Sequence, residues 1–333
     1  MDNYKGVLVC GEMADGKLAP ITIELLGVGR KLADELGEEL SILLLGSKSG
    51  ALGQDAIAYG ADNVYISEDS LFDIYNSDAY TMATANLCKK ILPSIMLFGY
   101  TDIGCDLSPR LNGRLGGGLS MECSALSIDP ATKLLVTTRP VFGGNALATM
   151  LSKTARPQMA TIRAKVMPPA EHNDSRQGKV IPLEDKVDPS ALKVKVIEKI
   201  KEEVEGVKLE DAEVVVAGGR GMGTAADFAK LRELAGVLGG AVGGTRVACD
   251  EGWVSATLQI GQSGKVVSPK LYLAVGLSGA MAHIAACLGS TCIVAITKDN
   301  EANIFNVAHF GIVGDWTAIL PPLTEKMTEL KGQ

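Results

Sequence analysis

The feature that most constrains the fold is an unbroken apolar run, LSILLL at Leu40–Leu45, which ends at Gly46. A strand that is apolar at nearly every position is typical of a parallel sheet whose two faces are both covered by helices. Amphipathic helical patterns flank this run at residues 21–36 and 51–59. An α/β fold with a mostly parallel sheet is therefore predicted for the first half of the chain.

The same alternation of strand and helix patterns extends along the first half. Further strands are expected at residues 4–10, 63–66, 94–98, 134–138 and 159–166, and a further helix at 79–92. Asp102 is expected to cap another helix, which the glycines at 116–118 would end. Strands that alternate with helices imply right-handed crossovers between parallel neighbours.

The length of 333 residues suggests two domains at roughly 150 residues each. Residues 168–190 are polar and contain four prolines, which predicts a long surface connection or linker. A returning strand is expected at residues 193–200, followed by a charged stretch. We place the boundary near Val204, which gives an N-terminal α/β domain over 1–203 and a second domain over 204–333.

Composition excludes several classes of function. The net charge is −7 and the basic residues are dispersed, which argues against a nucleic-acid-binding protein. No apolar run approaches the roughly 18 residues of a membrane span. The start, MDNYKGVLVCGEM, has no signal or transit pattern, so a cytoplasmic protein is expected. The seven cysteines contain no CxxC pair, so no metal site is expected.

The second half repeats the pattern of strands that run into turns. Strands are expected at residues 213–217, Leu271–Val275 and 291–296, and helices from about 225 to 238 and up to Cys287. Fourteen of the 38 glycines lie between Gly218 and Gly279, so the backbone there can approach a ligand closely. Because ligands of open α/β sheets bind at the carboxyl ends of the strands, the site is expected in these turns.

Two of these turns have the composition of phosphate-binding loops. Residues 221–226 fit GxGxxA between a strand and a helix, although the ribose-binding acid expected about 20 residues later is missing and Asp250 lies further on. The turn at residues 276–280 offers the Ser278 hydroxyl and free amides. Tight turns without a ligand are the alternative interpretation, but two such turns in one domain fit a dinucleotide better than a single phosphate.

Three other features allow either a structural or a functional interpretation. His283 is either a satisfied core histidine or a group that points into the same crevice. Residues 259–265 form either an ordinary hairpin turn or a set of donors and acceptors for the edge of a flat heterocycle. Arg246, among dense glycines, is either a solvated cation or a guanidinium that stacks on a ligand ring.

The motifs of the second half, taken in order, resemble the alpha subunit of electron transfer flavoprotein. The stretch from Gln259 to Pro321 contains GQSGKVV, LYLAVGLSGA with a histidine shortly after it, AITKD and GIVGD. GGRG after EVVVA and the TR of GGTRVACDEGW also match the family pattern. The resemblance extends more loosely into the first half, through GYTDIGCDLSPRLNGRLGGGLS and TRPVFGGNALATM.

The resemblance implies a fold, a cofactor and partners. The fold would be an N-terminal Rossmann-like α/β domain that contacts a beta subunit, and a C-terminal flavodoxin-like (DHS-like) domain that binds FAD. The FAD would carry single electrons to another redox protein such as ferredoxin. The electrons would come from a flavoprotein such as an acyl-CoA dehydrogenase, or from NADH through a flavin of the beta subunit. Electron bifurcation and simple relay both remain open. Residues 204–209 would be the hinge for rotation of the second domain.

The resemblance also implies roles for individual residues. Arg246, His283 and Ser263 would tune the flavin: Arg246 over the isoalloxazine, His283 at the N1–C2 region, and the Ser263 hydroxyl near N5. The remaining FAD contacts would lie along the phosphates and ribityl chain, at the flavin edge and at the adenosine. They would be made by Arg220, Gly221, Thr245, Gln259, Ile260, Gly261, Gln262, Gly276, Ser278, Gly279, Ala280, Thr297, Lys298 and Asp315. Thr297 departs from the asparagine common in the family.

Two other classes of function remain open, and the first of them would use the same turns. One is a nicotinamide-dependent α/β dehydrogenase, although neither a convincing ribose acid nor a substrate domain is evident. The other is an adenine-nucleotide-binding module without redox chemistry, which the first domain alone would allow.

Overall fold

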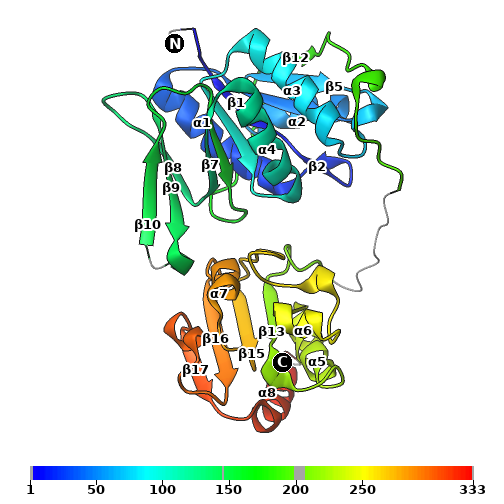
Figure 1. Cartoon of the computed structure of the whole chain (residues 1–333), viewed down its shortest axis with the longest axis vertical. Coiled ribbons are helices and arrows are strands. Elements are labelled where there is room, and N and C mark those ends of the chain that lie inside the picture. The colour runs from blue at the N-terminus through cyan, green and yellow to red at the C-terminus, as the bar shows by residue number, and fades with distance from the viewer. Residues whose placement is uncertain (1–2, 145, 199–206, 332–333) are drawn as a thin grey trace. The chain divides into compact units, whose positions relative to one another are not determined.

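The chain forms two compact units in the computed structural model, which describes residues 3–144, 146–198 and 207–331. The first unit comprises residues 1–141 and 147–200, and the second comprises 142–146 and 201–333 (Figure 1). The boundary expected between 203 and 204 lies outside the described residues. The expected hinge at 204–209 is described only from Val207 onward, and Leu209 at its end is buried in the core of the second unit.

The first unit is built on a seven-stranded sheet whose neighbouring strands are all parallel. Its order is β12 (Lys179–Pro182), β5 (Asn63–Ser67), β4 (Leu40–Leu45), β1 (Val7–Cys10), β6 (Ile95–Gly99), β11 (Gln158–Ile162) and β7 (Gly118–Cys123). The parallel sheet predicted from the apolar run is confirmed, and β4 has the predicted bounds.

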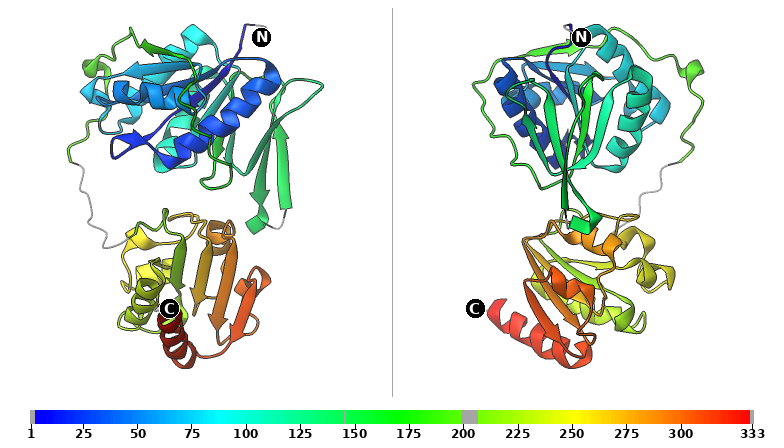
Figure 2. Two further views of the ribbon diagram at one scale, coloured as in Figure 1. Left: turned by 180° about the vertical axis from the view of Figure 1, so that it is seen from behind. Right: turned by 60° about the vertical axis from the view of Figure 1, so that its left-hand side comes forward.

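Helices cover both faces of this sheet, as Figure 2 shows from two sides. Val7 and Val9 pack on one face with α1 (Pro20–Leu36), and Leu8 and Cys10 pack on the other with α3 (Ser77–Ile91) and α4 (Asp102–Leu115). The short helix α2 (Gly53–Ala58) packs beside β5 and β12. The alternation of side chains along each strand therefore explains why β4 is buried at all six positions.

Three expectations for the first unit need correction. Thr101, not Asp102, caps α4, because its side chain accepts a hydrogen bond from the amide of Gly104 at 3.0 Å. The stretch at 168–190 is not only a connection, since it contains β12, which adds to the sheet beside β5. The described part of the expected strand at 193–200, up to residue 198, forms no strand.

Smaller sheets complete the first part of the chain. Strands β8 (Ala125–Ile128), β9 (Leu135–Val141) and β10 (Ala146–Leu151) form a three-stranded sheet in the order β10-β9-β8, in which β8 and β9 are antiparallel. The short strands β2 (Met13–Ala14) and β3 (Lys17–Leu18) form a hairpin. The strand expected at 134–138 is thus β9, outside the parallel sheet.

The second unit is a five-stranded parallel sheet in the order β14 (Ala241–Gly244), β13 (Val214–Gly218), β15 (Leu271–Val275), β16 (Cys292–Thr297) and β17 (Phe310–Val313). Counted from the start of the unit, this order is 2-1-3-4-5, which is the flavodoxin-like order. The flavodoxin-like fold class predicted for this half is confirmed.

Alternating strand residues also face two layers in the second unit. Val216, Leu273 and Val275 pack with residues of α5 (Phe228–Leu238) and α8 (Trp316–Lys331). Ala217 and Tyr272 pack on the other face with α7 (Met281–Cys287). The short helix α6 (Arg246–Asp250) follows β14. The connections between strands all start at the carboxyl edge of the sheet, which places the turns there.

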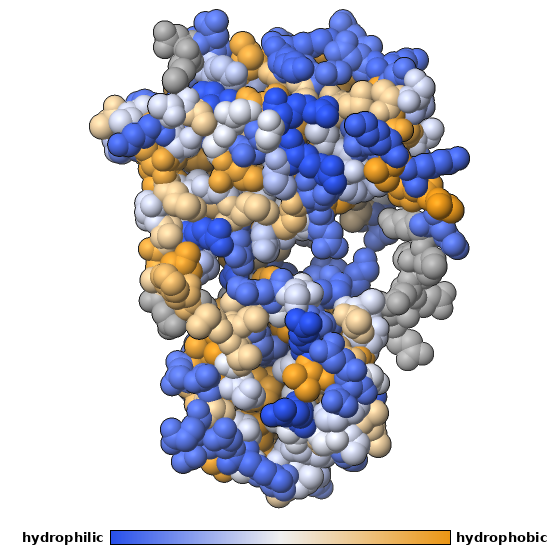
Figure 3. Space-filling view, viewed as in Figure 1, coloured by the Kyte–Doolittle hydropathy of each residue, from blue (hydrophilic) through white to orange (hydrophobic). Residues whose placement is uncertain are grey.

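The described parts of both units have no helix long and apolar enough to cross a membrane. They also hold no group of three or more His, Cys, Asp or Glu side chains that could bind a metal ion. The face drawn in Figure 3 mixes hydrophilic and apolar residues on both units.

Candidate functional site

The two glycine-rich turns of the second unit lie next to each other at the carboxyl edge of its sheet. One follows β13 and the other follows β15, and these strands are neighbours in the sheet. The chain continues from β13 to β14 on one side, whereas β15 lies on the other side. This reversal is the topological switch point, where open α/β sheets bind their ligands.

Backbone hydrogen bonds join the two turns directly. The amide of Gly219 donates to the carbonyl of Val275 at 3.0 Å, and that of Gly221 donates to the carbonyl of Gly276 at 2.8 Å. A Cβ on Gly221 would lie 2.7 Å from the Gly276 oxygen, and a Cβ on Gly276, which has a φ of +60°, would lie 2.9 Å from the Gly221 carbonyl carbon. These glycines are therefore required for the contact between the turns as well as for access by a ligand.

The first turn does not lead straight into a helix as the GxGxxA pattern predicts. Arg220–Met222 forms a single 3-10 turn, Gly223 has a φ of +100°, and α5 begins only at Phe228 rather than near Ala225. Asp227 occupies the N-cap position of α5, but its carboxylate makes no capping hydrogen bond and instead accepts one from the Thr224 hydroxyl at 2.6 Å. The groups that this turn exposes are its own backbone and the Arg220 side chain.

Several polar groups at this edge are free to meet a ligand. The Arg220 and Ser278 side chains are exposed, and neither makes a hydrogen bond or ion pair with any residue that the structure describes. Ala280, the N-cap of α7, is exposed beside them, and Gly279 has a φ of +75°. A Cβ on Gly279 would lie 2.4 Å from the amide nitrogen of Ile304, so the turn also depends on glycine there.

Thr245 and Arg246 lie between the end of β14 and the start of α6. The amide of Thr245 donates to the carbonyl of Gly218 at 3.0 Å, which ties it to the end of β13. Its hydroxyl oxygen is buried and has no hydrogen-bond partner among the described residues. Arg246 is largely exposed and forms only a long contact of 3.5 Å with Asp250, which is a weak surface pair. The Arg246 guanidinium is therefore open to a ligand at this edge, whereas the Thr245 hydroxyl lacks a partner but is buried.

Residues 259–264 form a tight turn beside the end of β14. The Gln259 side-chain amide donates to the Ser263 hydroxyl at 3.0 Å, and Gly264 donates to the carbonyl of Gly261 at 3.0 Å. Ile260 is buried, and its amide donates to the carbonyl of Gly244 at 2.8 Å, while Gln262 and Ser263 are exposed. The turn is thus fixed at its base and presents polar groups at its tip.

His283 lies inside the protein rather than at an open surface. Its Nε2 is 2.8 Å from the Tyr272 hydroxyl, and its Nδ1 is 3.0 Å from the carbonyl of Ile260. Burial lowers the pKa of His283 below its ordinary value, so the ring is neutral at neutral pH. Both ring nitrogens already have protein partners in this structure, and direct contact between His283 and a cofactor stays a prediction.

Thr297, Lys298 and Asp315 come together at the ends of neighbouring strands. Thr297 ends β16, and its carbonyl accepts from the amide of Gly314 at 3.0 Å. The Lys298 ammonium lies 2.8 Å from the Asp315 carboxylate, and this hydrogen bond lowers the pKa of Asp315 to about 2. Asp315 is therefore ionised across the physiological range.

The structure therefore brings most of the predicted site residues to the carboxyl edge of one sheet, whereas His283 is buried on α7. It also adds two residues that the sequence patterns did not indicate. Tyr272 is the hydrogen-bond partner of His283, and the indole Nε1 of Trp316 donates to the carbonyl of Gly221 at 3.0 Å. The position of Tyr272, eleven residues before His283, has no local sequence signal for such a pair.

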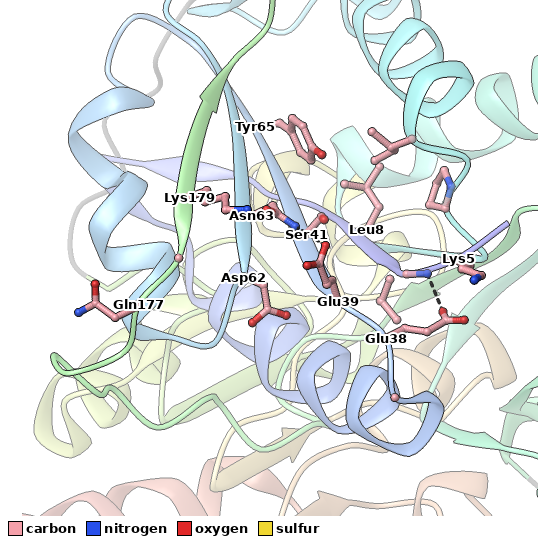
Figure 4. Close-up of a pocket in the computed structure, with 16 residues that line it drawn as sticks. Lys5, Leu8, Glu38, Glu39, Ser41, Asp62, Asn63, Tyr65, Gln177 and Lys179 are labelled. Carbon is pink, nitrogen blue, oxygen red and sulfur yellow. Dashed lines mark hydrogen bonds between the residues drawn. The ribbon is translucent and has the colours of Figure 1, made fainter. Parts of the chain in front are cut away.

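The first unit contains a larger cavity, of about 820 Å³, at the opposite edge of its sheet (Figure 4). It lies at the amino ends of β1, β4, β5 and β12. Its lining carboxylates are already engaged: Glu38 accepts from the amide of Gly6 at 2.6 Å, and Glu39 accepts from Asn63 at 2.9 Å. Neither its position nor its chemistry indicates a ligand site.

The switch point of the first unit, between β1 and β6, is filled by the chain itself. The cavity there is only about 20 Å³, enough for about one water molecule. Glu12, which follows β1, accepts a hydrogen bond of 2.6 Å from Thr101, which follows β6, and burial raises the pKa of this carboxyl. The adenine-nucleotide interpretation of the first domain therefore has no open crevice at the usual place.

The fold and the site define an α/β protein whose second unit has the strand order and the paired turns of a flavodoxin-like cofactor-binding domain. Residues 7–188 match the family model described as "Electron transfer flavoprotein domain", and residues 208–288 match the "Electron transfer flavoprotein FAD-binding domain".

Full-length relatives agree with the two models. The chain is 43% identical over 331 residues to "Electron transfer flavoprotein subunit alpha" of Thermoanaerobacterium thermosaccharolyticum, covering 99% of this chain and 100% of that protein. It is 44% identical to the protein of the same name from Megasphaera elsdenii, over 99% and 98% of the two chains. It is 41% identical to "Protein FixB" of Azorhizobium caulinodans, over 97% and 88%. The chain belongs to the family of electron transfer flavoprotein alpha subunits, and FAD is the cofactor of its second unit.

Proposed function

We propose that this chain is the FAD-carrying subunit of a cytoplasmic heterodimer with a beta subunit, and that it passes electrons one at a time. The donor would be a flavoprotein of the acyl-CoA dehydrogenase type, or NADH acting through a flavin of the beta subunit. The acceptor would be another redox protein, such as ferredoxin. The observation that carries this proposal is the meeting of two glycine turns at the switch point of a 2-1-3-4-5 sheet.

The residues at this edge fit a phosphate-bearing flavin on three independent grounds. The Thr245 hydroxyl is buried without a partner in the described chain, and such a group is stabilised by a ligand that completes its hydrogen bond. The exposed Arg220 guanidinium provides a positive charge for a phosphate. The glycines of both turns leave the backbone open to close approach.

We assign Arg220, Ser278 and Ala280 to the phosphates, because a guanidinium, a hydroxyl and an N-cap amide are the donors that phosphate oxygens accept. The ion pair of Lys298 and Asp315 would bind the adenosine end, where it offers one donor and one acceptor group. Gln259, Gln262 and Ser263 would line the flavin edge with amide and hydroxyl groups. Thr297 would contribute a hydroxyl at the adenosine end.

The bound flavin supplies the ring that accepts and releases electrons, and the protein sets how strongly it holds them. Arg246 would stabilise negative charge on the reduced ring. A charge-assisted hydrogen bond contributes about 1.5–3 kcal/mol. If it acts only in the reduced state, this corresponds to roughly 60–130 mV for one electron. Single side chains of this site can therefore decide which partners the carrier can reduce.

The proposal is tested with the purified heterodimer. Visible absorption bands near about 370 and 450 nm are expected from bound flavin. Stopped-flow reduction is then followed with NADH and, separately, with a reduced acyl-CoA dehydrogenase. Reduction by either donor, followed by reoxidation by a redox protein, supports the carrier function. A flavin that neither donor reduces would refute it.

The same experiment separates relay from bifurcation. A bifurcating protein reduces ferredoxin with NADH only when the acyl-CoA dehydrogenase is also present to accept the other electron of the pair. A relay shows no such dependence. A colourless protein that oxidises an alcohol or hydroxy acid with NAD would instead favour a nicotinamide-dependent dehydrogenase.

A further inference from the structure

A chain of buried hydrogen bonds connects the sheet of the second unit to the turn at residues 259–264, which we call the flavin-edge turn after its proposed role. Tyr272 of β15 is 0% exposed, and its hydroxyl lies 2.8 Å from Nε2 of His283, which is 5% exposed. Nδ1 of His283 lies 3.0 Å from the carbonyl oxygen of Ile260, inside the turn. The imidazole thus bridges a rigid strand and the turn that is assigned to the flavin edge.

The partners of His283 determine where its proton lies. A carbonyl oxygen can only accept, so Nδ1 must carry the hydrogen that points to Ile260. Because burial lowers the pKa of His283, the ring is neutral and Nε2 has no hydrogen. Burial, with a smaller contribution from the neighbouring Cys287 thiol, also raises the pKa of Tyr272 well above its ordinary value, so its hydroxyl stays protonated. Because Nε2 can only accept, the Tyr272 hydroxyl is the donor of this hydrogen bond.

This bridge adds to two backbone contacts that hold the same segment against α7. The amide of Gln262 donates to the carbonyl of Ala282 at 3.0 Å, and that of Val267 donates to the carbonyl of Ala286 at 2.8 Å. Ile260 has its amide on Gly244 and its carbonyl on His283, so both of its backbone groups are engaged on other elements. The base of the turn therefore cannot shift without breaking the bond to His283.

We propose that Tyr272 is a positioning residue of the FAD site. By donating to Nε2, it holds His283 in the Nδ1–H tautomer and in one ring orientation, and His283 in turn holds Ile260 and the flavin-edge turn in place. Tyr272 itself is buried and acts on the site only through His283. The inference rests on the proposed function only in placing the flavin against this turn.

The test uses the full chain with Tyr272→Phe, which removes the hydroxyl and keeps the ring. Side-chain ¹⁵N spectra of the FAD-free protein are recorded at pH 7, with His283 assigned by comparison with His283→Gln. The wild type is expected to show a protonated Nδ1 and an Nε2 that accepts a hydrogen bond. In Tyr272→Phe the Nε2 resonance is expected to move to the frequency of a free acceptor nitrogen.

FAD affinity provides the second readout. Loss of the donor frees the imidazole to rotate, so Tyr272→Phe is expected to weaken FAD binding about tenfold, which corresponds to about 1.4 kcal/mol. Tyr80→Phe is the matched control, because Tyr80 donates a similar bond of 2.8 Å to the carbonyl of Phe72, in the first unit. It should leave both the His283 spectrum and the FAD affinity unchanged.

Two outcomes would overturn the inference. One is a wild-type His283 that carries its proton on Nε2 or on both nitrogens, a measurement that requires no folded Tyr272 variant. The other is a folded Tyr272→Phe protein whose FAD affinity stays within twofold of the wild type. Neither readout involves electron transfer, so a wild type that binds FAD but exchanges no electrons would refute the proposed function alone.

Discussion

The hydroxyl of Tyr272 lies 2.8 Å from Nε2 of His283, and the two side chains come from adjacent layers of the second unit, β15 and α7. Both are inside the protein, and each satisfies a polar atom of the other. A histidine placed in this way is neutral and fixed in orientation. It links β15 to the backbone of the turn at residues 259–264.

Stability of the second unit should depend on pH through His283. Burial depresses the pKa of His283 in the folded protein, so the unfolded chain binds more protons as the pH falls. The contribution of His283 to the free energy of unfolding is therefore present above the unfolded pKa of about 6.5 and is lost as the pH falls through the folded pKa. Both tryptophans, Trp253 and Trp316, lie in this unit, so their fluorescence reports its unfolding. Urea titrations at pH 7.5 and 5.5 should show lower stability at pH 5.5.

The loss of stability between these two pH values should shrink in His283→Gln, which cannot titrate. His172→Gln is the control, since His172 is partly exposed and lies in the first unit. An unchanged pH dependence in His283→Gln would show that another group causes it.

Arg246→Ala should lower the one-electron reduction potential of the bound flavin by roughly 60–130 mV, the equivalent of one charge-assisted hydrogen bond. The physical reason is the loss of a positive charge that favours the reduced ring. Potentiometric titration with a redox dye measures the shift. Arg232→Ala removes an exposed arginine from α5 and should leave the potential unchanged. Equal potentials in wild type and Arg246→Ala would refute the role of Arg246.

Gly276→Ala should destabilise the second unit by about 1–3 kcal/mol, because φ is +60° and the new Cβ would lie 2.9 Å from the carbonyl carbon of Gly221. It should also abolish measurable FAD binding, since the two turns would move apart. Gly236→Ala is the control: this glycine is in α5, and a Cβ there meets nothing within 4 Å. That substitution should stabilise the unit by about 0.5–1 kcal/mol. Similar effects of Gly276→Ala and Gly236→Ala would contradict the direct contact between the two glycine-rich turns.

Trp316→Phe should weaken the second unit by about 0.5–1.5 kcal/mol, because the carbonyl of Gly221 loses the bond from the indole Nε1. FAD binding should weaken as well, since this bond holds the first turn against α8. Urea unfolding followed by circular dichroism gives the first value, and fluorescence titration gives the second. Trp253→Phe is the comparison, because the indole of Trp253 packs on Phe228 without such a link to the turn. A Trp316→Phe protein with wild-type FAD affinity would show that the bond does not position the turn.

Local patterns predicted most of the secondary structure, because a strand that is buried on both faces is apolar at nearly every position. The run at Leu40–Leu45 became β4 with the same bounds, and Leu271–Val275 became β15. Patterns failed where a distant partner decides the outcome. The segment at 179–182 lies in a stretch predicted as a polar connection, but it forms a strand because it pairs with β5. A local prediction also failed at α4, where Thr101, one residue before Asp102, provides the cap by accepting from the amide of Gly104.

The sequence by itself determined the family, the cofactor and the edge of the sheet at which the site lies, because glycine turns and strand runs are local features. Only the tertiary structure decided what each turn does. It showed that Gly221 and Gly276 contact each other, that Asp227 stands before α5, and that His283 bonds to Tyr272 and Ile260. These relationships join residues that are 11 to 55 positions apart or depend on where a helix begins. They follow from the packing of the sheet and its helices, which a local pattern does not encode.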